Sequence, residues 1–181
     1  MTTNSAGSRR ALTLADLEGL LDKQALYENA VLYCRGQDRK DLELMKSTFW
    51  PDATDDHGIF VGSAHEFCEW TFARHKQTQH VSQHYLTNVH VELDGDRARR
   101  ESVFVYVMVR TDGVRQLQGG RYRDLCERRG SEWKVLRRVV ITDHVGEFTT
   151  NASLENMFGG FPSGAARGDV YPRDPIYDSD W

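Results

Sequence analysis

The chain has 181 residues, of which 39% are hydrophobic and 28% are charged, and its formal net charge is -4. This length allows one well-formed core rather than two, and the composition is that of an ordinary globular domain. No basic run indicates a nucleic-acid partner, and no apolar run is long enough for a membrane span or a secretion signal. The three cysteines are widely spread, which favours reduced thiols and a cytoplasmic location.

The N-terminal part of the chain carries a long helical pattern. Residues 1–12 are small and polar, which predicts a flexible N-terminus. From Thr13 onward, apolar residues recur at three- and four-residue spacing, which predicts a helix with one apolar stripe. The pattern ends near Gly36, since glycine commonly terminates helices. The stripe consists of Leu14, Leu17, Leu21, Ala25, either Tyr27 or Glu28, Val31 and Cys34.

Two shorter helices are predicted next. Residues 41–49 place apolar side chains on one side of a short helix, which Pro51 ends. The segment SAHE, residues 63–66, matches a capping box and therefore predicts the start of a third helix. Its inward side consists of Phe67, Trp70 and Thr71.

Beyond the third helix the apolar period changes to two, which is typical of strands. Four strands are predicted, over residues 84–93, 98–110, 114–128 and 132–143, with short polar turns between them. Turns this short make neighbouring strands antiparallel. Helices first and a curved antiparallel sheet last predict an α+β fold with the helices gathered on one side of the sheet.

The C-terminal part differs in composition from the predicted helices and from the predicted strands. Residues 146–181 combine glycine and proline with aromatic side chains, whereas flexible tails are usually poor in aromatic residues. We therefore divide the chain into the N-terminus, one domain over 13–145, and a tail that packs over a pocket mouth or onto a neighbouring subunit. The aromatic residues of the tail include Phe158, Phe161, Tyr171, Tyr177 and Trp181.

The stretch QTQHVSQHYLTN, residues 77–88, carries two histidines four residues apart. On a helix such a pair can bind zinc, but no Glu follows His80 directly and the segment leads into a strand. We therefore expect no metal site. On a strand, His84, Leu86 and Asn88 fall on one face, which could meet solvent or line a polar-bottomed cavity.

The strand predicted over 98–110 is mostly apolar on both faces, so we expect both faces to be covered. Phe104, Tyr106 and Met108 share one face. With His84 beside them, these side chains could line a cavity for a hydrophobic, aromatic small molecule, or they could form an ordinary packed core.

Several segments resemble the SnoaL-like branch of the nuclear transport factor 2-like superfamily, whose fold is a cone-shaped α+β barrel. They cover about residues 20 to 145, and their order and spacing together are more specific than each segment alone. The resemblance implies N-terminal helices packed on a strongly curved, mainly antiparallel sheet. The segments include YCRGQDRKDLELMKSTFWPDA (33–53), DDHGIFVG (55–62), QHYLTNVHVELDGDRA (83–98) and GGRYRDLCERRGSEWKV (119–135).

Scytalone dehydratase, hexachlorocyclohexane dehydrochlorinase and ketosteroid isomerase share this architecture, and the first two are cofactor-free lyases with an Asp–His pair. The matching positions here are Asp38, in RGQDRKD, and His84, in QHYLTN. The resemblance implies that Asp38 fixes the tautomer of His84 and raises the basicity of its other ring nitrogen, so that His84 acts as general base. Tyr33 stands where the dehydrochlorinase has a lysine. It is expected to donate a hydrogen bond or a proton, or simply to pack its ring.

Further positions are candidates for substrate binding. Asn88 is expected to accompany the base on the same strand face. His57 could enter the pocket or sit in a turn, and Arg121 could bind a polar substrate group or belong to a surface ladder. The remaining candidates are Trp50, Phe104, Tyr106 and Met108.

The resemblance thus implies an enzyme without metal or organic cofactor. It would be a lyase that removes water or formaldehyde from a hydrophobic, aromatic small molecule, for example an aryl diol of the lignin-dimer type. The same fold could instead serve a double-bond isomerase, a polyketide cyclase or a non-catalytic ligand-binding module. A valine-rich outer sheet face and the behaviour of relatives imply a homo-oligomer, either a dimer or a trimer.

Overall fold

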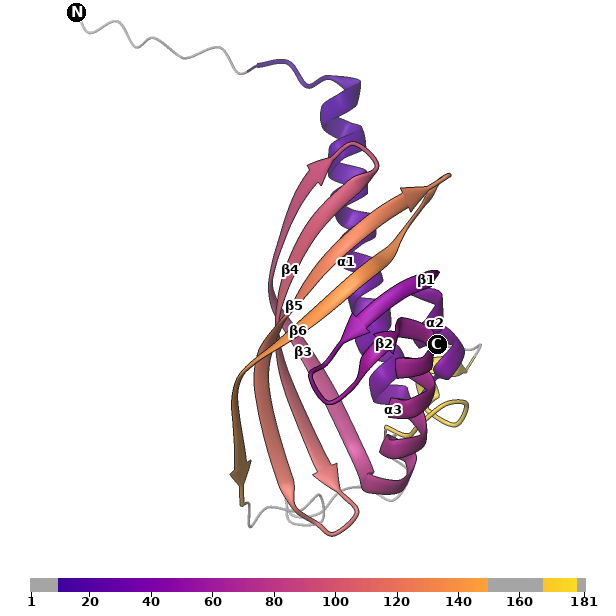
Figure 1. Ribbon diagram of the computed structural model, residues 1–181, viewed down its shortest axis with the longest axis vertical. Coiled ribbons are helices and arrows are strands. Elements are labelled where there is room, and N and C mark those ends of the chain that lie inside the picture. Colours follow the sequence, from indigo (N-terminus) through magenta and orange to yellow (C-terminus); the bar gives the residue numbers. More distant parts are fainter. Residues whose placement is uncertain (1–9, 150–167, 179–181) are drawn as a thin grey trace, which may run out of the picture.

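The computed structural model describes residues 10–149 and 168–178, which form helices on one side of a curved sheet (Figure 1). The sheet has the strand order β2-β1-β6-β5-β4-β3 and is open, which confirms the α+β fold without closure into a barrel. Among the strands that the structure describes, β1 and β6 pair in parallel and the other neighbours are antiparallel. The elements are α1 (Leu14–Arg39), α2 (Leu42–Ser47), β1 (Phe49–Asp56), β2 (Val61–Ser63), α3 (Ala64–Thr78), β3 (Gln79–Asp94), β4 (Arg97–Arg110), β5 (Arg115–Arg129) and β6 (Glu132–Phe148).

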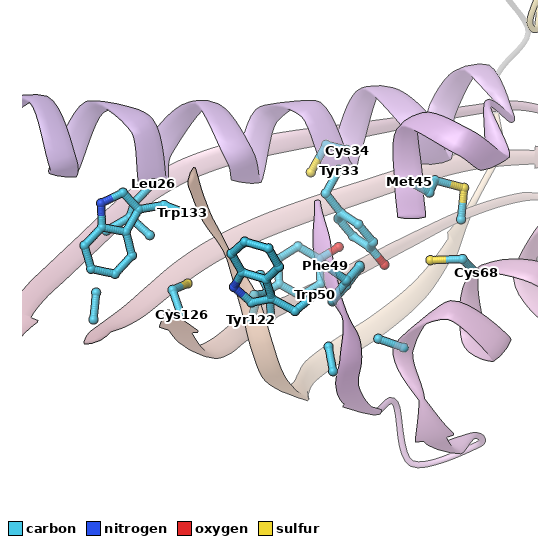
Figure 2. Packing of buried hydrophobic residues seen from close by; sticks show 14 of the residues in the cluster. Leu26, Tyr33, Cys34, Met45, Phe49, Trp50, Cys68, Tyr122, Cys126 and Trp133 are labelled. Atoms are coloured by element: carbon cyan, nitrogen blue, oxygen red, sulfur yellow. The ribbon is translucent and has the colours of Figure 1, made fainter. Parts of the chain in front are cut away.

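The core lies between the helices and the inner face of the sheet. Figure 2 shows Tyr33 pointing from α1 toward Phe49 of β1, and the two ring centroids are 5.5 Å apart. Tyr122 of β5 meets the Tyr33 ring edge-on at 5.7 Å. Burial of these large rings is the main source of stability in this layer, because aromatic side chains remove much apolar surface from water.

The first helix continues through Gly36 and ends at Arg39, so the predicted end at the glycine is wrong. A Cβ atom on Gly36 would lie 2.8 Å from Cγ and 2.9 Å from the backbone nitrogen of Met45. The glycine therefore allows α1 and α2 to approach closely, and Lys40 ends the helix in the left-handed region, with φ 52°. As a result, Asp38 lies inside the last helical turn, not after it.

The predicted apolar stripe of α1 is wrong over the first turns. Leu14, Leu17 and Leu21 are exposed, and complete burial begins at Leu26. The reason is visible in Figure 1, where the N-terminal turns of α1 project beyond the ends of the strands.

Two strands that the sequence did not predict, β1 and β2, precede α3. The second helix ends at Ser47, and Phe49, predicted to be helical, begins β1. Pro51 lies within β1, at a register irregularity against β6 between Phe49 and Thr54. Proline is tolerated there because an irregular position does not need its missing N–H donor.

An irregularity in β3 changes which side chains face the core. Leu86 pairs with Phe104 of β4, and Val89 pairs with Ser102, so an extra residue of β3 is accommodated between them. Such a bulge reverses the alternation of side chains along the strand. Residues before and after it cannot be assigned to faces by one continuous period of two.

Within residues 10–149 and 168–178, no helix is both long and apolar enough to cross a membrane.

Candidate active site

The last turn of α1 brings Asp38 to the edge of the sheet, where it binds His84 of β3. Oδ1 of Asp38 accepts a hydrogen bond from Nδ1 of His84 at 2.6 Å, and Oδ2 accepts the backbone N–H of the same residue at 2.7 Å. The two side chains are 9% and 8% exposed. Because β3 is an edge strand, its outward N–H needs a partner from outside the sheet, and the carboxylate supplies it.

This geometry fixes the chemistry of the imidazole. With Nδ1–H donating to Asp38, the lone pair of His84 lies on Nε2, which has no hydrogen-bond partner among the described residues. The ring stacks on Tyr106, with centroids 4.2 Å apart, and Phe104 lies at 6.4 Å. An oriented imidazole backed by aromatic rings is suited to accept a proton from a bound molecule.

A groove of about 720 Å³ reaches this pair between α1, β3 and the C-terminal segment. Asp38 and His84 line it together with Val31, Leu86 and Ile176. This volume and the mixture of apolar and polar lining are typical of small-molecule sites.

The described C-terminal segment packs on the end of α1 in its own chain, beside the groove (Figure 1). The backbone N–H of Tyr171 donates to the carbonyl of Arg39 at 2.6 Å, and the Arg39 side chain lies 3.3 Å from the carboxylate of Asp174. The hydroxyl of Tyr177, in a short 3-10 helix (Pro175–Tyr177), donates to Asp41 at 3.1 Å. The predicted tail residues Phe158, Phe161 and Trp181 lie outside the described residues.

Tyr33 is fully buried, and two aromatic rings in contact with each other, those of Tyr122 and Phe104, connect it to His84. Its hydroxyl accepts a hydrogen bond from Nε2 of Gln37 at 2.8 Å. Its ring meets Tyr122 edge-on, and Tyr122 stacks on Phe104 at 4.4 Å, next to His84. Burial raises the pKa of Tyr33 well above its usual value, so the phenol stays protonated.

Phe104, Tyr106 and Met108 share the inner face of β4, as their alternation predicts, since the first two are buried and pair with inner-face positions of β3. The phenol of Tyr106 donates to Gln79 at 2.7 Å. None of the three lines the groove. They support the imidazole of His84 from behind rather than forming the wall of this groove.

Two other predicted binding residues point away from the pair. Asn88 is exposed because it lies in the bulge of β3, so the prediction that it shares a face with His84 is wrong. Arg121 lies on the outer face of β5 and pairs with Asp143 at 3.0 Å. This is the surface-ladder alternative, and it argues against a role for Arg121 in this site.

Trp50 is buried but distant from the pair. Its indole N–H donates to the carbonyl of Glu127 in β5 at 2.9 Å. The position on β5 that lies level with His84 is Gln118, because His84 of β3 pairs with Tyr106 of β4 and Tyr106 pairs with Gln118. At about 3.3 Å per residue, Glu127 is roughly 30 Å from Gln118 along the strand. The placement of Trp50 therefore argues against contact with a molecule bound at the pair.

The two histidines of the QTQHVSQHYLTN stretch do not converge, because His80 is exposed and His84 is directed toward Asp38. Among the residues that the structure describes, no group of three or more His, Cys, Asp or Glu side chains is arranged to hold a metal ion.

His57 has a carboxylate partner that the sequence analysis missed. Its Nδ1 is hydrogen-bonded to Oδ1 of Asp55, and its ring stacks on Phe67 with centroids 3.8 Å apart. Asp55 belongs to β1, and residues two apart on an extended chain share a face. Recognising β1 from the sequence would therefore have connected the two side chains.

A partly buried histidine of α3, His75, also lies near the pair without having been predicted. Its Nε2 is 3.1 Å from the hydroxyl of Thr71, and its ring is 6.4 Å from that of Tyr106. Burial lowers the pKa of His75 to about 3, and the nearby positive charges of Lys40 and Arg74 act in the same direction. His75 is therefore neutral in the folded protein at ordinary pH.

We expect the folded state to lose stability on acidification because of His75. Its pKa of about 3 lies below the unfolded value of 6.5, so the unfolded chain binds the proton first as the pH falls. The stability is complete above 6.5 and declines toward pH 3, by up to about 1.4 kcal/mol per pH unit from this residue. Urea unfolding at pH 7 and pH 5 should show a smaller decline for His75→Gln. Equal declines for both proteins would contradict the assignment.

The comparisons with known proteins agree with this architecture. A hexachlorocyclohexane dehydrochlorinase from Novosphingobium barchaimii has a TM-score of 0.67 at 20% identity, covering 74% of this chain and 94% of that one. A candidate scytalone dehydratase from Novosphingobium aromaticivorans has a TM-score of 0.67 at 18% identity, covering 82% and 97%. A protein of unknown function from Mycobacterium tuberculosis has a TM-score of 0.65 at 20% identity, covering 75% and 79%.

No curated protein sequence gives a significant match to this chain. The sequence pattern of the SnoaL-like domain family matches residues 18–139, most of the helices and the sheet. The chain therefore belongs to the SnoaL-like domain family.

Proposed function

We propose that this protein is a cofactor-independent lyase that acts on a hydrophobic, aromatic small molecule by acid/base catalysis. The observation that carries the proposal is the double hydrogen bond from Asp38 to His84 at the wall of a groove of suitable volume. Support comes also from similar folds whose names describe eliminations, the dehydrochlorinase and the candidate scytalone dehydratase.

In a dehydration, Nε2 of His84 would take a proton from carbon. The electrons of the C–H bond form the double bond, the neighbouring C–O bond breaks, and its electron pair leaves on the hydroxyl oxygen. Tyr33 stays protonated because burial raises its pKa, so it is suited to donate a hydrogen bond to that oxygen. The proton that His84 has taken would then convert the leaving hydroxide to water.

Loss of formaldehyde from an aryl 1,3-diol needs the same base. Here His84 would take the proton of the terminal hydroxyl, and the C–C bond would break as the C=O bond of formaldehyde forms. The C–C electrons form a double bond while the benzylic hydroxyl leaves, and protonation converts it to water. Both routes are consistent with one imidazole base and one neutral donor.

A substrate screen tests the proposal. Purified protein treated with EDTA would be offered β-hydroxy aryl ketones, 1,2-diaryl-1,3-propanediols and a β,γ-unsaturated ketosteroid. Absorbance of the conjugated product and trapping of formaldehyde distinguish the reactions. We expect turnover of one of the first two classes without added metal or cofactor. Turnover of the steroid alone would favour an isomerase, and binding without turnover would favour a ligand-binding module.

We also propose a homo-oligomer, a dimer or trimer formed through the outer face of the sheet. Val81 and Tyr85 of β3 are exposed there, beside the half-buried valines of β4. Light scattering after size exclusion should give two or three times 20.8 kDa, and Tyr85→Glu should lower that mass. A mass of one chain for the unaltered protein would contradict this proposal.

Two further proposals concern the C-terminal tail and the location of the protein in the cell. We propose that the C-terminal tail covers the groove, since Asp174, Pro175 and Ile176 already line it. We also propose a cytoplasmic location, which is consistent with three buried, unpaired cysteines at Cys34, Cys68 and Cys126.

A further inference from the structure

Seven buried side-chain nitrogen and oxygen atoms lack hydrogen-bond partners within the described part of the chain. Three of them belong to residues around Tyr33, namely Oδ2 of Asp55, Oε1 of Gln37 and Nη1 of Arg138. The three residues are 1%, 4% and 1% exposed. Native proteins rarely leave buried polar atoms unpaired, and each such atom requires an explanation. A polar group bound near Tyr33 would supply the missing hydrogen bonds of these three atoms.

The three residues lie around the side chain of Tyr33. Nε2 of Gln37 donates to this hydroxyl at 2.8 Å, and the guanidinium carbon of Arg138 lies 4.1 Å from the centroid of the Tyr33 ring. Asp55 and Arg138 are register partners on β1 and β6, and the negative charge of Asp55 helps to raise the pKa of Tyr33. Figure 2 shows Tyr33 extending from α1 across the interior toward Cys68.

The carboxylate of Asp55 is held in place by His57. Oδ1 is hydrogen-bonded to the imidazole, which is itself fixed by stacking on Phe67. The side chain of Asp55 is fully buried, whereas that of His57 is 17% exposed, so the imidazole connects the interior with the surface. The second oxygen, Oδ2, is therefore a fixed anionic acceptor without a donor.

A hydroxyl group matches this set of atoms, because it offers one donor and can accept as well. We propose that Asp55, Gln37 and Tyr33 form a binding site for the hydroxyl group of an aromatic alcohol or phenol. The O–H would donate to Oδ2 of Asp55, and the oxygen would accept from Tyr33 or Nη1 of Arg138. An ether or halide at the same place brings no donor and would leave the buried carboxylate unpaired.

The inference deepens the proposed function, and it rests on that function only for the identification of this hydroxyl as the group that leaves. The site then makes the protein selective for hydroxylated over halogenated or methylated molecules. Loss of a hydrogen bond to a charged group corresponds to roughly tenfold or more in affinity.

Two probes of similar size test the site, 4-fluorophenol and 4-fluoroanisole, titrated against the full chain and followed by ¹⁹F NMR. We expect the phenol to bind at least about tenfold more tightly, because only the phenol can donate to Asp55. Asp55→Asn should reduce this preference to less than about threefold. Asp143→Asn, which removes an exposed carboxylate paired with Arg121 on the outer face, should retain the preference of the unaltered protein.

Equal binding of the two probes by the unaltered protein would overturn the inference, as would a full preference in Asp55→Asn. If that variant does not fold, Gln37→Leu is tested instead, because it removes the hydrogen bond that orients the Tyr33 hydroxyl while leaving Asp55 bound to His57. Weaker binding of 4-fluorophenol by Gln37→Leu supports the site, and unchanged binding overturns it. Asp38→Asn should retain the preference even where it abolishes turnover, so failure of the lyase proposal and failure of this site are separate results.

Discussion

Replacing His84 by alanine is expected to lower turnover of the substrate found in the screen by roughly 10²–10⁴-fold, the usual contribution of a general base. Asp38→Asn should act in the same direction, because an amide cannot serve as the anionic partner that stabilises the protonated imidazole. Initial rates measure the effect, and thermal unfolding should show that both variants remain folded.

The matched control is His90→Ala on the same strand. His90 is exposed, and its Nε2 lies 3.4 Å from the carboxylate of Glu92, so the two residues form a carboxylate–histidine pair at the surface. Its replacement should leave turnover within about twofold, since exposed pairs contribute little. Unaltered turnover in both His84→Ala and Asp38→Asn would remove the proposed mechanism.

The second large effect concerns stability and is expected from Asp124→Asn. Asp124 is fully buried and accepts hydrogen bonds from Arg100 at 2.7 Å and from Arg138 at 2.8 Å. Burial alone would raise the pKa of Asp124, but the charges of Arg138 and Arg100 outweigh it and hold the pKa below the usual value. Removing the carboxylate charge leaves two buried guanidinium groups without compensation, at a cost of about 3–5 kcal/mol.

Chemical denaturation of Asp124→Asn measures this cost, and Asp52→Asn is the matched control. Asp52 also pairs with an arginine, Arg129, at 2.8 Å, but both side chains are substantially exposed. The control should change the free energy of unfolding far less, because an exposed ion pair is screened by solvent. Equal effects of the two substitutions would show that the buried pair is not a source of stability.

The fold class was predictable because the helical and alternating periods are long and uninterrupted in most elements. The four long strands were found from their alternation, although β3 begins five residues before the predicted start. Strand β1 was missed because Pro51 and a register irregularity conceal its alternation. The end of α1 was misplaced because glycine has two uses, and Gly36 serves close packing against Met45 rather than termination.

The candidate site was predictable only in part. The resemblance to the family indicated Asp38 and His84, and the structure places them in direct contact, but their catalytic role remains a proposal. Asn88 was misassigned because a bulge is a property of strand pairing and leaves no clear signal in one strand. Partners such as Asp55 and His75 depend on tertiary packing, which a periodic pattern does not contain.

The tautomer of His84 in the free protein tests the central claim most directly, and it needs no substrate. A long-range ¹H–¹⁵N correlation spectrum at pH 8 distinguishes an imidazole protonated on Nδ1 from one protonated on Nε2. Because Asp38 accepts from Nδ1, we predict a proton on Nδ1 and a bare Nε2, with this preference lost in Asp38→Asn. A proton on Nε2 in the unaltered protein would contradict the assignment of His84 as the base.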